Sequence, residues 1–296
     1  MESTVNELCK NIFGIYPDHI EKCSVGSVNI VYMADVCSER YVIRLNRDKG
    51  AYSESIDLLK QAWSLGLPVS KVVNIGVYEE FEFIILTYVR GRDLGIVYPM
   101  LNTADKMNIA AEVVSLQQKA AGFVYKGNRY PWYKFVYDAL DVAEKRIRQN
   151  GFFDVSKVEK VRQASQYFTG YFETLNPVTY LDDISTKNLL IENGHVSGIV
   201  DIDEIGFGDR LTYVALMRVA LRNMGYDDII ADQILNFMNV GDVERRAELF
   251  YALLYCVDFM GERGSVFNGK KVPVDEKIIS RLNNIYDILW NTFCGV

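Results

Sequence analysis

Residues 179–202 read TYLDDISTKNLLIENGHVSGIVDI, and they are the most informative segment of the sequence. A short apolar run at 189–191 leads into a Glu-Asn-Gly turn, and residues 196–202 have the pattern of a returning strand. Asp183 and Asn188 precede this predicted hairpin, and Asp201 follows it. A carboxylate, an amide and a second carboxylate suit phosphoryl transfer, in which one carboxylate positions a hydroxyl nucleophile and the other two groups hold Mg²⁺.

The rest of the chain divides into a β-rich front and a helical remainder. Residues rich in Val, Ile, Tyr and Phe predict strands, and 51–65 has the apolar spacing of a helix. A polar break at Arg90-Gly91-Arg92-Asp93 then precedes mostly helical patterns, so we expect an α+β chain with two lobes. The predicted division is a β-rich lobe at 1–86, a hinge at 87–93, and a helical lobe at 94–296 that includes the hairpin at 180–209. Strands are predicted at 29–36, 41–45, 71–78 and 81–89, and helices at 103–121, 132–149, 156–173, 211–224, 229–238, 243–261 and 275–293.

Composition excludes several classes of protein. The 296 residues are 49% hydrophobic and carry a net charge of −7, so attraction to nucleic acid or to anionic membranes is not expected. The five cysteines are scattered and include no C-x-x-C pair, which predicts reduced thiols. No apolar run is long enough to span a bilayer, and the N-terminus lacks the features of a signal peptide. We therefore expect a cytoplasmic protein that tolerates cationic ligands more readily than anionic ones, and its oligomeric state, monomer or homodimer, is left open.

The motifs resemble those of the aminoglycoside phosphotransferase and choline-kinase type of small-molecule kinase, which has a protein-kinase-like fold. That family reads His-Gly-Asp-x-x-x-x-Asn, then a strand, a turn and Ile-Asp, then Gly-Asp; this chain has Leu181-Asp182-Asp183, Asn188, Asp201 and Gly208-Asp209. The resemblance implies that Asp183 is the catalytic carboxylate, that Asn188 and Asp201 are Mg²⁺ ligands, and that Asp209 is structural. It also implies ATP or GTP as the phosphate donor.

The front lobe extends the resemblance. Residues 26–32, GSVNIVY, match the family's Gly-x-x-Asn-x-x-Tyr nucleotide loop, and Arg44 takes the place of the cation that meets the α- and β-phosphates. Glu54 is the expected partner of this cation, although Ser53 and Asp57 lie close to it in the sequence. Residues 86–94 resemble the linker whose backbone binds the nucleobase. The implied nucleotide-binding residues are Gly26, Ser27, Asn29, Arg44, Glu54, Leu86, Thr87 and Val89.

Two positions depart from the family pattern. The catalytic-loop His is replaced by Leu181, and a His common in the first long helix of the second lobe is replaced by Gln117. The only histidines are His19 and His195, so a mechanism with an imidazole base is nearly excluded. Loss of the bracing His raises the alternative of a nucleotide-binding protein that transfers no phosphate.

The acceptor is the least defined part of the prediction. An aminoglycoside-type antibiotic is the first expectation, with choline, a macrolide, a sugar or another hydroxylated metabolite as alternatives. Acidic residues after 225 are candidates to bind a cationic acceptor, because ammonium groups pair with carboxylates. Asp258 and Glu262 are preferred among Asp227, Asp228, Asp232, Asp258 and Glu262, since they end an otherwise apolar helix. Lys187 and Asp203 are further candidates for phosphate, metal or substrate contacts.

Overall fold

The computed structural model describes residues 1–23, 29–267 and 270–295. It separates into two compact units. The first comprises Met1–Gly91 together with Ser197–Glu204, and the second comprises Arg92–Val196 together with Ile205–Val296. The sequence pattern places the whole hairpin at 180–209 in the helical lobe, whereas the segment 197–204 packs with the first unit.

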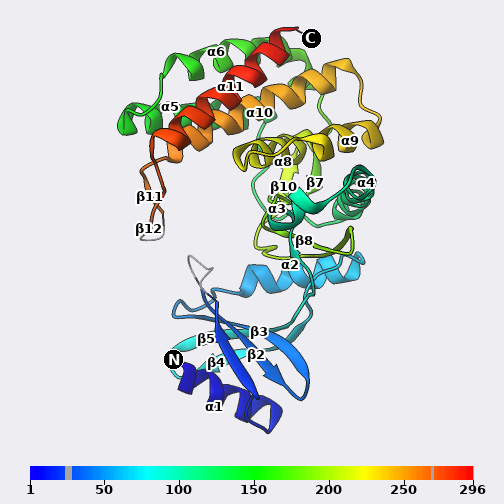
Figure 1. Cartoon of the computed structure of the whole chain (residues 1–296), viewed down its shortest axis with the longest axis vertical. Helices are drawn as coiled ribbons and strands as arrows, with labels where there is room; N and C mark the ends of the chain where they lie inside the picture. The colour runs from blue at the N-terminus through cyan, green and yellow to red at the C-terminus, as the bar shows by residue number, and fades with distance from the viewer. Residues whose placement is uncertain (24–28, 268–269, 296) are drawn as a thin grey trace. The chain divides into compact units, whose positions relative to one another are not determined.

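The first unit is an antiparallel sheet with a helix on each face (Figure 1). Its strands lie in the order β1-β2-β3-β5-β4. Helix α1 and helix α2 pack on opposite faces, because alternate residues of β5 contribute to two separate apolar clusters. The elements are α1 (Glu2–Phe13), β1 (His19–Lys22), β2 (Ile30–Val36), β3 (Glu39–Asn46), α2 (Ser53–Ser64), β4 (Val72–Tyr78) and β5 (Phe81–Thr87).

Strand β5 shows why these residues form a central strand. Phe83 and Ile85 belong to the α1-side cluster, and Ile84 and Leu86 belong to the α2-side cluster. All four side chains are buried, which matches an apolar run without polar alternation. The turn into β5 places Glu79 at a φ of 53°, in the left-handed region.

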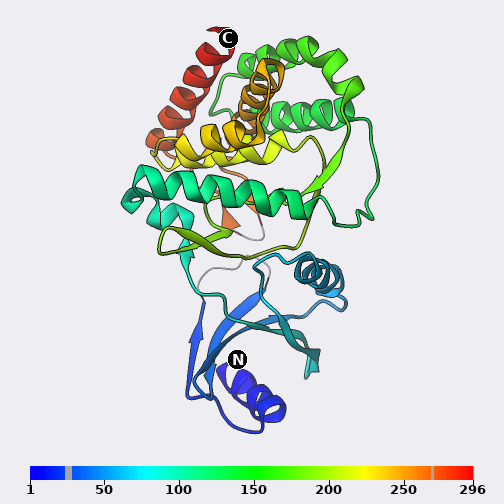
Figure 2. The ribbon, with the colours of Figure 1, turned by 90° about the vertical axis from the view of Figure 1, so that its right-hand side faces the viewer.

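The second unit is mostly helical, and three small sheets lie among its helices. Helix α10 (Asp242–Glu262) is its centre: most of its residues from Ala247 to Gly261 are buried, and it packs against α5, α6, α8 and α11 (Figures 1 and 2). The other helices are α3 (Leu94–Val97), η1 (Tyr98–Met100), α4 (Thr103–Ala120), α5 (Trp132–Asn150), α6 (Ser156–Ser165), η2 (Gln166–Phe168), α7 (Thr169–Thr174), α8 (Leu211–Asn223), α9 (Ile229–Met238) and α11 (Glu276–Gly295).

Short strands precede and follow the loops that contain Asp183, Asn188 and Asp201. Strand β7 pairs with β10, and β6 pairs with β8 in a sheet of order β6-β8-β9. The bounds are β6 (Arg92–Asp93), β7 (Val178–Tyr180), β8 (Leu189–Glu192), β9 (His195–Ile199), β10 (Gly206–Gly208), β11 (Val266–Phe267) and β12 (Lys270–Lys271). The loop with Asp183 and Asn188 therefore begins after β7 and ends at β8. Within the described ranges, no helix is long and apolar enough to cross a membrane.

Candidate active site

The loop between β7 and β8 holds the Asp183 carboxylate in a defined orientation. Its Oδ1 accepts a hydrogen bond from Ser185 Oγ at 2.8 Å, and its Oδ2 accepts one from Asn188 Nδ2 at 2.8 Å. Ser185 is buried, whereas Asp183 is exposed. The four-residue gap predicted from the sequence thus brings Asp183 and Asn188 into direct contact. A fixed, solvent-accessible carboxylate can align a hydroxyl group and accept its proton.

A side chain from α4 holds the start of this loop. Gln117 Nε2 donates to the Leu181 carbonyl at 2.8 Å, and the Leu181 N–H donates to Gln117 Oε1 at 2.9 Å. Gln117 and Leu181 are both buried. The two positions that depart from the family pattern therefore contact each other. This pairing could not be predicted from local spacing, because it joins a side chain to a backbone 64 residues away.

The Gly208-Asp209 pair anchors the start of α8. Asp209 is buried and accepts hydrogen bonds from the Leu211 N–H at 3.0 Å and from the hydroxyls of Tyr171 and Tyr251 at 2.8 and 2.9 Å. Gly208 has a φ of 155°, and a Cβ there would lie 1.8 Å from the Trp132 ring. These contacts assign Asp209 a place in the core, in keeping with the structural role that the resemblance implies.

Arg44, on β3, contacts two carboxylates of the segment 197–204 within the first unit. Its guanidinium lies 3.2 Å from Asp201 Oδ1 and 3.7 Å from Asp203 Oδ2. Burial raises the pKa of Asp201, as does the charge of Asp203, and Arg44 offsets only part of this effect. Glu54, the partner expected from the sequence, is exposed on α2, and the ion pairs described for Arg44 are those with Asp201 and Asp203.

The backbone of Asp201 has an unusual conformation. Its φ of 61° lies in the left-handed region, which is costly for a residue other than Gly. Such strain persists where the surrounding structure imposes it, and it is concentrated at functional sites. Glu79 shares this conformation in the first unit, but it lies in the turn between β4 and β5, whereas the Asp201 carboxylate contacts Arg44.

The remaining nucleotide residues are partly described. Asn29 Oδ1 accepts hydrogen bonds from Asn46 Nδ2 at 2.9 Å and from the Tyr52 hydroxyl at 3.1 Å. Leu86 is buried, and the Thr87 N–H donates to the Lys71 carbonyl at 2.9 Å. Among the described residues, the Val89 N–H donates to no backbone carbonyl in the turns and loops. Gly26 and Ser27 lie outside the described residues.

Asp258 and Glu262 lie four residues apart near the end of α10. Asp258 Oδ1 is 3.1 Å from Arg146 Nη1, on α5. Burial raises the pKa of Asp258, and Arg146 opposes this shift. Burial also raises the pKa of Glu262, and the Asp258 charge raises it further. Among the described residues, no side chain donates a hydrogen bond to the Glu262 carboxylate, so Glu262 is the more available of the two.

Lys187 is exposed in the loop that holds Asp183, and its charge acts on the carboxylate of Asp93.

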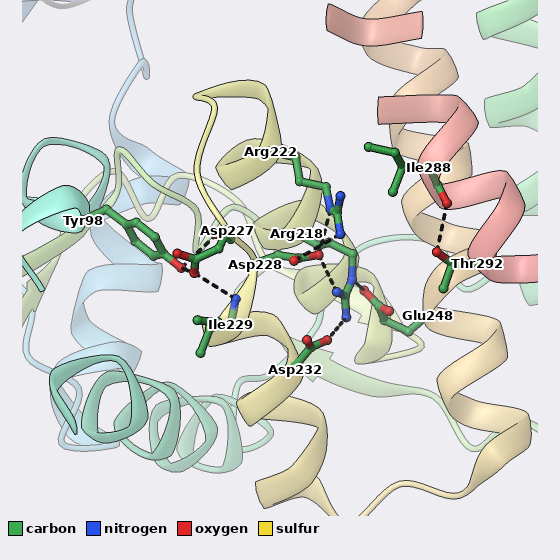
Figure 3. Close-up of polar contacts among 10 residues, drawn as sticks. All are labelled: Tyr98, Arg218, Arg222, Asp227, Asp228, Ile229, Asp232, Glu248, Ile288 and Thr292. Carbon is green, nitrogen blue, oxygen red and sulfur yellow. Dashed lines mark hydrogen bonds and ion pairs between the residues drawn. The ribbon is translucent and has the colours of Figure 1, made fainter. Parts of the chain in front are cut away.

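The other acidic candidates are engaged in ion pairs (Figure 3). Arg218, buried on α8, donates to Asp228 at 2.6 Å, to Asp232 at 2.9 Å and to Glu248 at 2.8 Å. Asp228 also accepts from Arg222 at 2.8 Å. Asp227 instead contacts Lys106 Nζ at 2.7 Å and the Tyr98 hydroxyl at 2.6 Å. Because each already contacts at least one cation, Asp227, Asp228 and Asp232 are poorer candidates for binding an acceptor.

The donor set implied for Mg²⁺ fits a hard cation. Both hydrogen bonds of Asn188 Nδ2 go to Asp183, and no described residue donates to its Oδ1. Asp201 likewise meets Arg44 through Oδ1 alone. Oxygen atoms are the ligands that Mg²⁺ requires, and this ion usually takes one or two protein groups with phosphates and water. No group of three or more His, Cys, Asp or Glu suited to a metal occurs within residues 1–23, 29–267 and 270–295.

Comparison with known proteins gives one family and many similar folds. The model of the phosphotransferase enzyme family matches residues 19–247. The solved structure of a thermostable mutant of aminoglycoside phosphotransferase APH(4)-Ia has a TM-score of 0.66 at 17% identity and covers 96% of this chain and 98% of its own. ADP-bound aminoglycoside phosphotransferase APH(2'')-Ib has a TM-score of 0.66 at 12% identity, with 98% of each chain covered. No curated protein sequence matches.

These comparisons confirm the predicted fold class. The similar structures are aminoglycoside phosphotransferases, and the chain shares their fold over nearly its whole length. The small antiparallel sheet and the helical unit are the two parts that the sequence pattern predicts. The predicted α+β protein-kinase-like fold is therefore confirmed, and the predicted resemblance to aminoglycoside phosphotransferases is confirmed as well.

Proposed function

Because the chain belongs to the phosphotransferase enzyme family, we propose that it moves the γ-phosphate of ATP or GTP to a hydroxyl group of a small molecule. The preferred acceptor is an aminoglycoside-type antibiotic, and the reaction would then confer resistance by O-phosphorylation. Similar solved structures include ternary complexes with hygromycin B and with streptomycin and ATP, which supports both the nucleotide and this acceptor class. Several of the similar structures contain ADP, ATP or AMP-PNP, so ATP is the first donor to test.

The observation that carries the proposal is the geometry of Asp183. Two side-chain donors, from Ser185 and Asn188, fix both carboxylate oxygens while the group stays exposed. Each carboxylate oxygen keeps a lone pair for an incoming hydroxyl group. Asp183 would orient this hydroxyl group and accept its proton as the bond to phosphorus forms.

Charge on the transferred phosphate has to be balanced by cations. Arg44, on β3, would bind the nucleotide phosphates, and Lys187, which is exposed in the catalytic loop, would contact the transferred group. The oxygen atoms of Asn188 and Asp201 would hold Mg²⁺, which supplies electrostatic stabilisation of the phosphates when it is bound. On phosphate binding, Arg44 would exchange its contacts with Asp201 and Asp203 for phosphate oxygens.

The acceptor preference depends on α10. Glu262 has a half-buried carboxylate to which no described side chain donates a hydrogen bond, although the charges of Arg263 and Arg146 act on it. Its neighbour Asp258 is paired with Arg146. Partial burial strengthens a charged hydrogen bond to an ammonium group. Choline, a macrolide or a sugar remains the alternative acceptor if a neutral or singly charged molecule is preferred.

The test measures phosphate transfer directly. The purified chain is incubated with Mg-ATP or Mg-GTP and hygromycin B, gentamicin, streptomycin, choline, a macrolide or a sugar, and phosphorylated acceptor is detected by mass spectrometry. For the accepted substrate, Asp183→Asn should lower kcat by about 10²–10⁴-fold, which is the range for loss of a general base. Asp287→Asn is the control, because Asp287 is an exposed residue of α11 paired with Lys157.

The rival function predicts a different result. A nucleotide-binding protein without phosphotransfer would bind ATP, phosphorylate no acceptor, and show the same nucleotide turnover with and without Asp183→Asn. Loss of kcat in Asp183→Asn with unchanged nucleotide affinity would separate the two, because the general base acts on the acceptor hydroxyl and not on the nucleotide.

A further inference from the structure

The peptide two residues before Asp183 is held by a single buried carboxamide. Gln117 donates to the Leu181 carbonyl at 2.8 Å and accepts from the Leu181 N–H at 2.9 Å, so both ends of its side chain are used. Only 7% of Gln117 and 3% of Leu181 are exposed. Without this side chain, a buried backbone donor and a buried backbone acceptor would both lack partners.

A carboxamide suits this task because it offers a donor and an acceptor side by side in one plane. It therefore pairs with the Leu181 peptide much as a neighbouring strand would. The two bonds together fix the position and the rotation of this peptide, which a single hydrogen bond does not. The side chain of Leu181 takes no part in them and is free to pack in the core.

Helix α4 supports the same segment at other points (Figure 2). Thr179 Oγ1 donates to the Ala120 carbonyl at 3.0 Å, just before Leu181. At the far end of the hairpin, Glu112 Oε1 lies 2.7 Å from His195 Nδ1. The helix is thus a platform along which the segment from β7 to β9 is attached, and Gln117 is its attachment nearest to Asp183.

We propose that Gln117 is the positioning residue of the catalytic loop and that it replaces a histidine brace in this chain. The proposal rests on the proposed function of Asp183. Gln117 acts through the Leu181 peptide, which sets where the chain enters the loop and so where Ser185 and Asn188 meet the Asp183 carboxylate. A chain with Leu at position 181 can in this way keep an ordered loop, because the brace acts on the backbone of that residue.

The first test replaces the carboxamide by an apolar chain of similar length. Gln117→Met should lower kcat about 10–100-fold, because a displacement of about 1 Å in a reacting group can cost a factor of about 10². The KM for Mg-ATP should change by less than about twofold, because Gln117 does not touch the nucleotide. Rates are measured with Mg-ATP and whichever of hygromycin B, gentamicin and streptomycin the protein phosphorylates. If it phosphorylates none of them, the rate of Mg-ATP hydrolysis is measured instead.

A core variant of the same helix tests for a general loss of structure. Val113 is buried on α4 and has no polar side-chain atom. Val113→Ala should lower the melting temperature yet leave kcat within about twofold of the original. Gln117→Asn keeps the carboxamide on a shorter chain and should give a kcat between that of the original chain and that of Gln117→Met. If Gln117→Met does not fold, Gln117→Asn carries the test.

A double substitution separates the proposal from the proposed function. In the Asp183→Asn background, Gln117→Met should change the residual rate by less than about twofold, because a positioning effect disappears with the group that is positioned. Equal loss of kcat in Val113→Ala and Gln117→Met, or full additivity with Asp183→Asn, would overturn the role of Gln117. If Asp183→Asn alone leaves the kcat of the original chain unchanged, the proposed function is instead overturned.

Discussion

The carboxylates of Asp258 and Glu262 give a cationic acceptor a distinctive pH dependence. Burial raises the pKa of both groups, so each takes up its proton at a higher pH than an exposed carboxylate does. As the pH falls through these raised pKa values, the charge that attracts an ammonium group is lost. The KM for a cationic acceptor should therefore rise on the acid side, and it should begin to rise above the ordinary pKa range of Asp and Glu.

Glu262→Gln isolates the group responsible. The variant should raise the KM for the cationic acceptor about tenfold at neutral pH, since a charged hydrogen bond contributes about 1.5–3 kcal/mol. It should also reduce the acid-side rise in KM, because only Asp258 is then left to titrate. The measurement is KM against pH for both proteins, with Glu276→Gln, at the exposed start of α11, as the matched control. A KM that rises equally in the two variants would contradict a role for Glu262.

At single residues, sequence spacing predicts contacts that are local along the chain. Asp183 and Asn188 meet because only four residues separate them and the loop closes on itself. Contacts between distant elements follow the tertiary packing instead, and the Gln117–Leu181 pairing is of this kind. Glu54 shows the same limit, since the carboxylates that meet Arg44 come from a segment more than 150 residues further on.

The charged cluster around Arg218 joins three helical elements and should dominate their stability. Arg218 contacts Glu248 on α10 and Asp228 at the start of α9, and Glu248 is completely buried (Figure 3). Arg218→Met would leave Glu248 buried without its cation, which costs about 3–5 kcal/mol in the free energy of unfolding. Urea denaturation of the second unit measures this loss.

Restoring an apolar contact should recover part of that stability. In Arg218→Met with Glu248→Leu, no buried charge remains unpaired at Glu248, and Asp228 keeps its bond with Arg222. Arg148→Met is the control, because Arg148 forms an exposed pair with Glu144 that is worth at most about 0.5 kcal/mol. A double variant as unstable as Arg218→Met would show that the loss does not come from an unpaired Glu248.

At the scale of elements, periodicity predicts long helices and central strands well. Helix α9 begins and ends at the predicted residues, and α4 differs by one residue. The predicted helix at 156–173 is instead divided into α6, η2 and α7, because the chain tightens at Gln166–Phe168. Helix α1 was not predicted, although Val5, Leu8 and Cys9 give it an apolar face. Among the strands of two to four residues, β8 was recognised from its apolar run before a turn, whereas β1, β6 and β7 have patterns too short to be recognised.

The net charge of the whole chain is concentrated in the first unit. That unit has 15 of the 39 acidic residues but only 9 of the 32 basic ones, and the second unit has 24 and 23. The second unit, which includes the helices proposed to bind the acceptor, has a net charge of only −1 (23 basic against 24 acidic residues). A cationic acceptor must therefore be attracted by local carboxylates such as Asp258 and Glu262, since the second unit has almost no net charge.

This distribution predicts opposite effects of salt on the two substrates. At about 0.1 M salt the Debye length is about 10 Å, so added salt weakens the general repulsion between the acidic first unit and an anionic nucleotide. The KM for Mg-ATP should then stay constant or fall as salt is raised. The KM for a cationic acceptor should rise, because its attraction to local carboxylates is screened. Initial rates between low and moderate potassium chloride measure both constants, and a KM for Mg-ATP that rises as steeply as that of the acceptor would contradict this account.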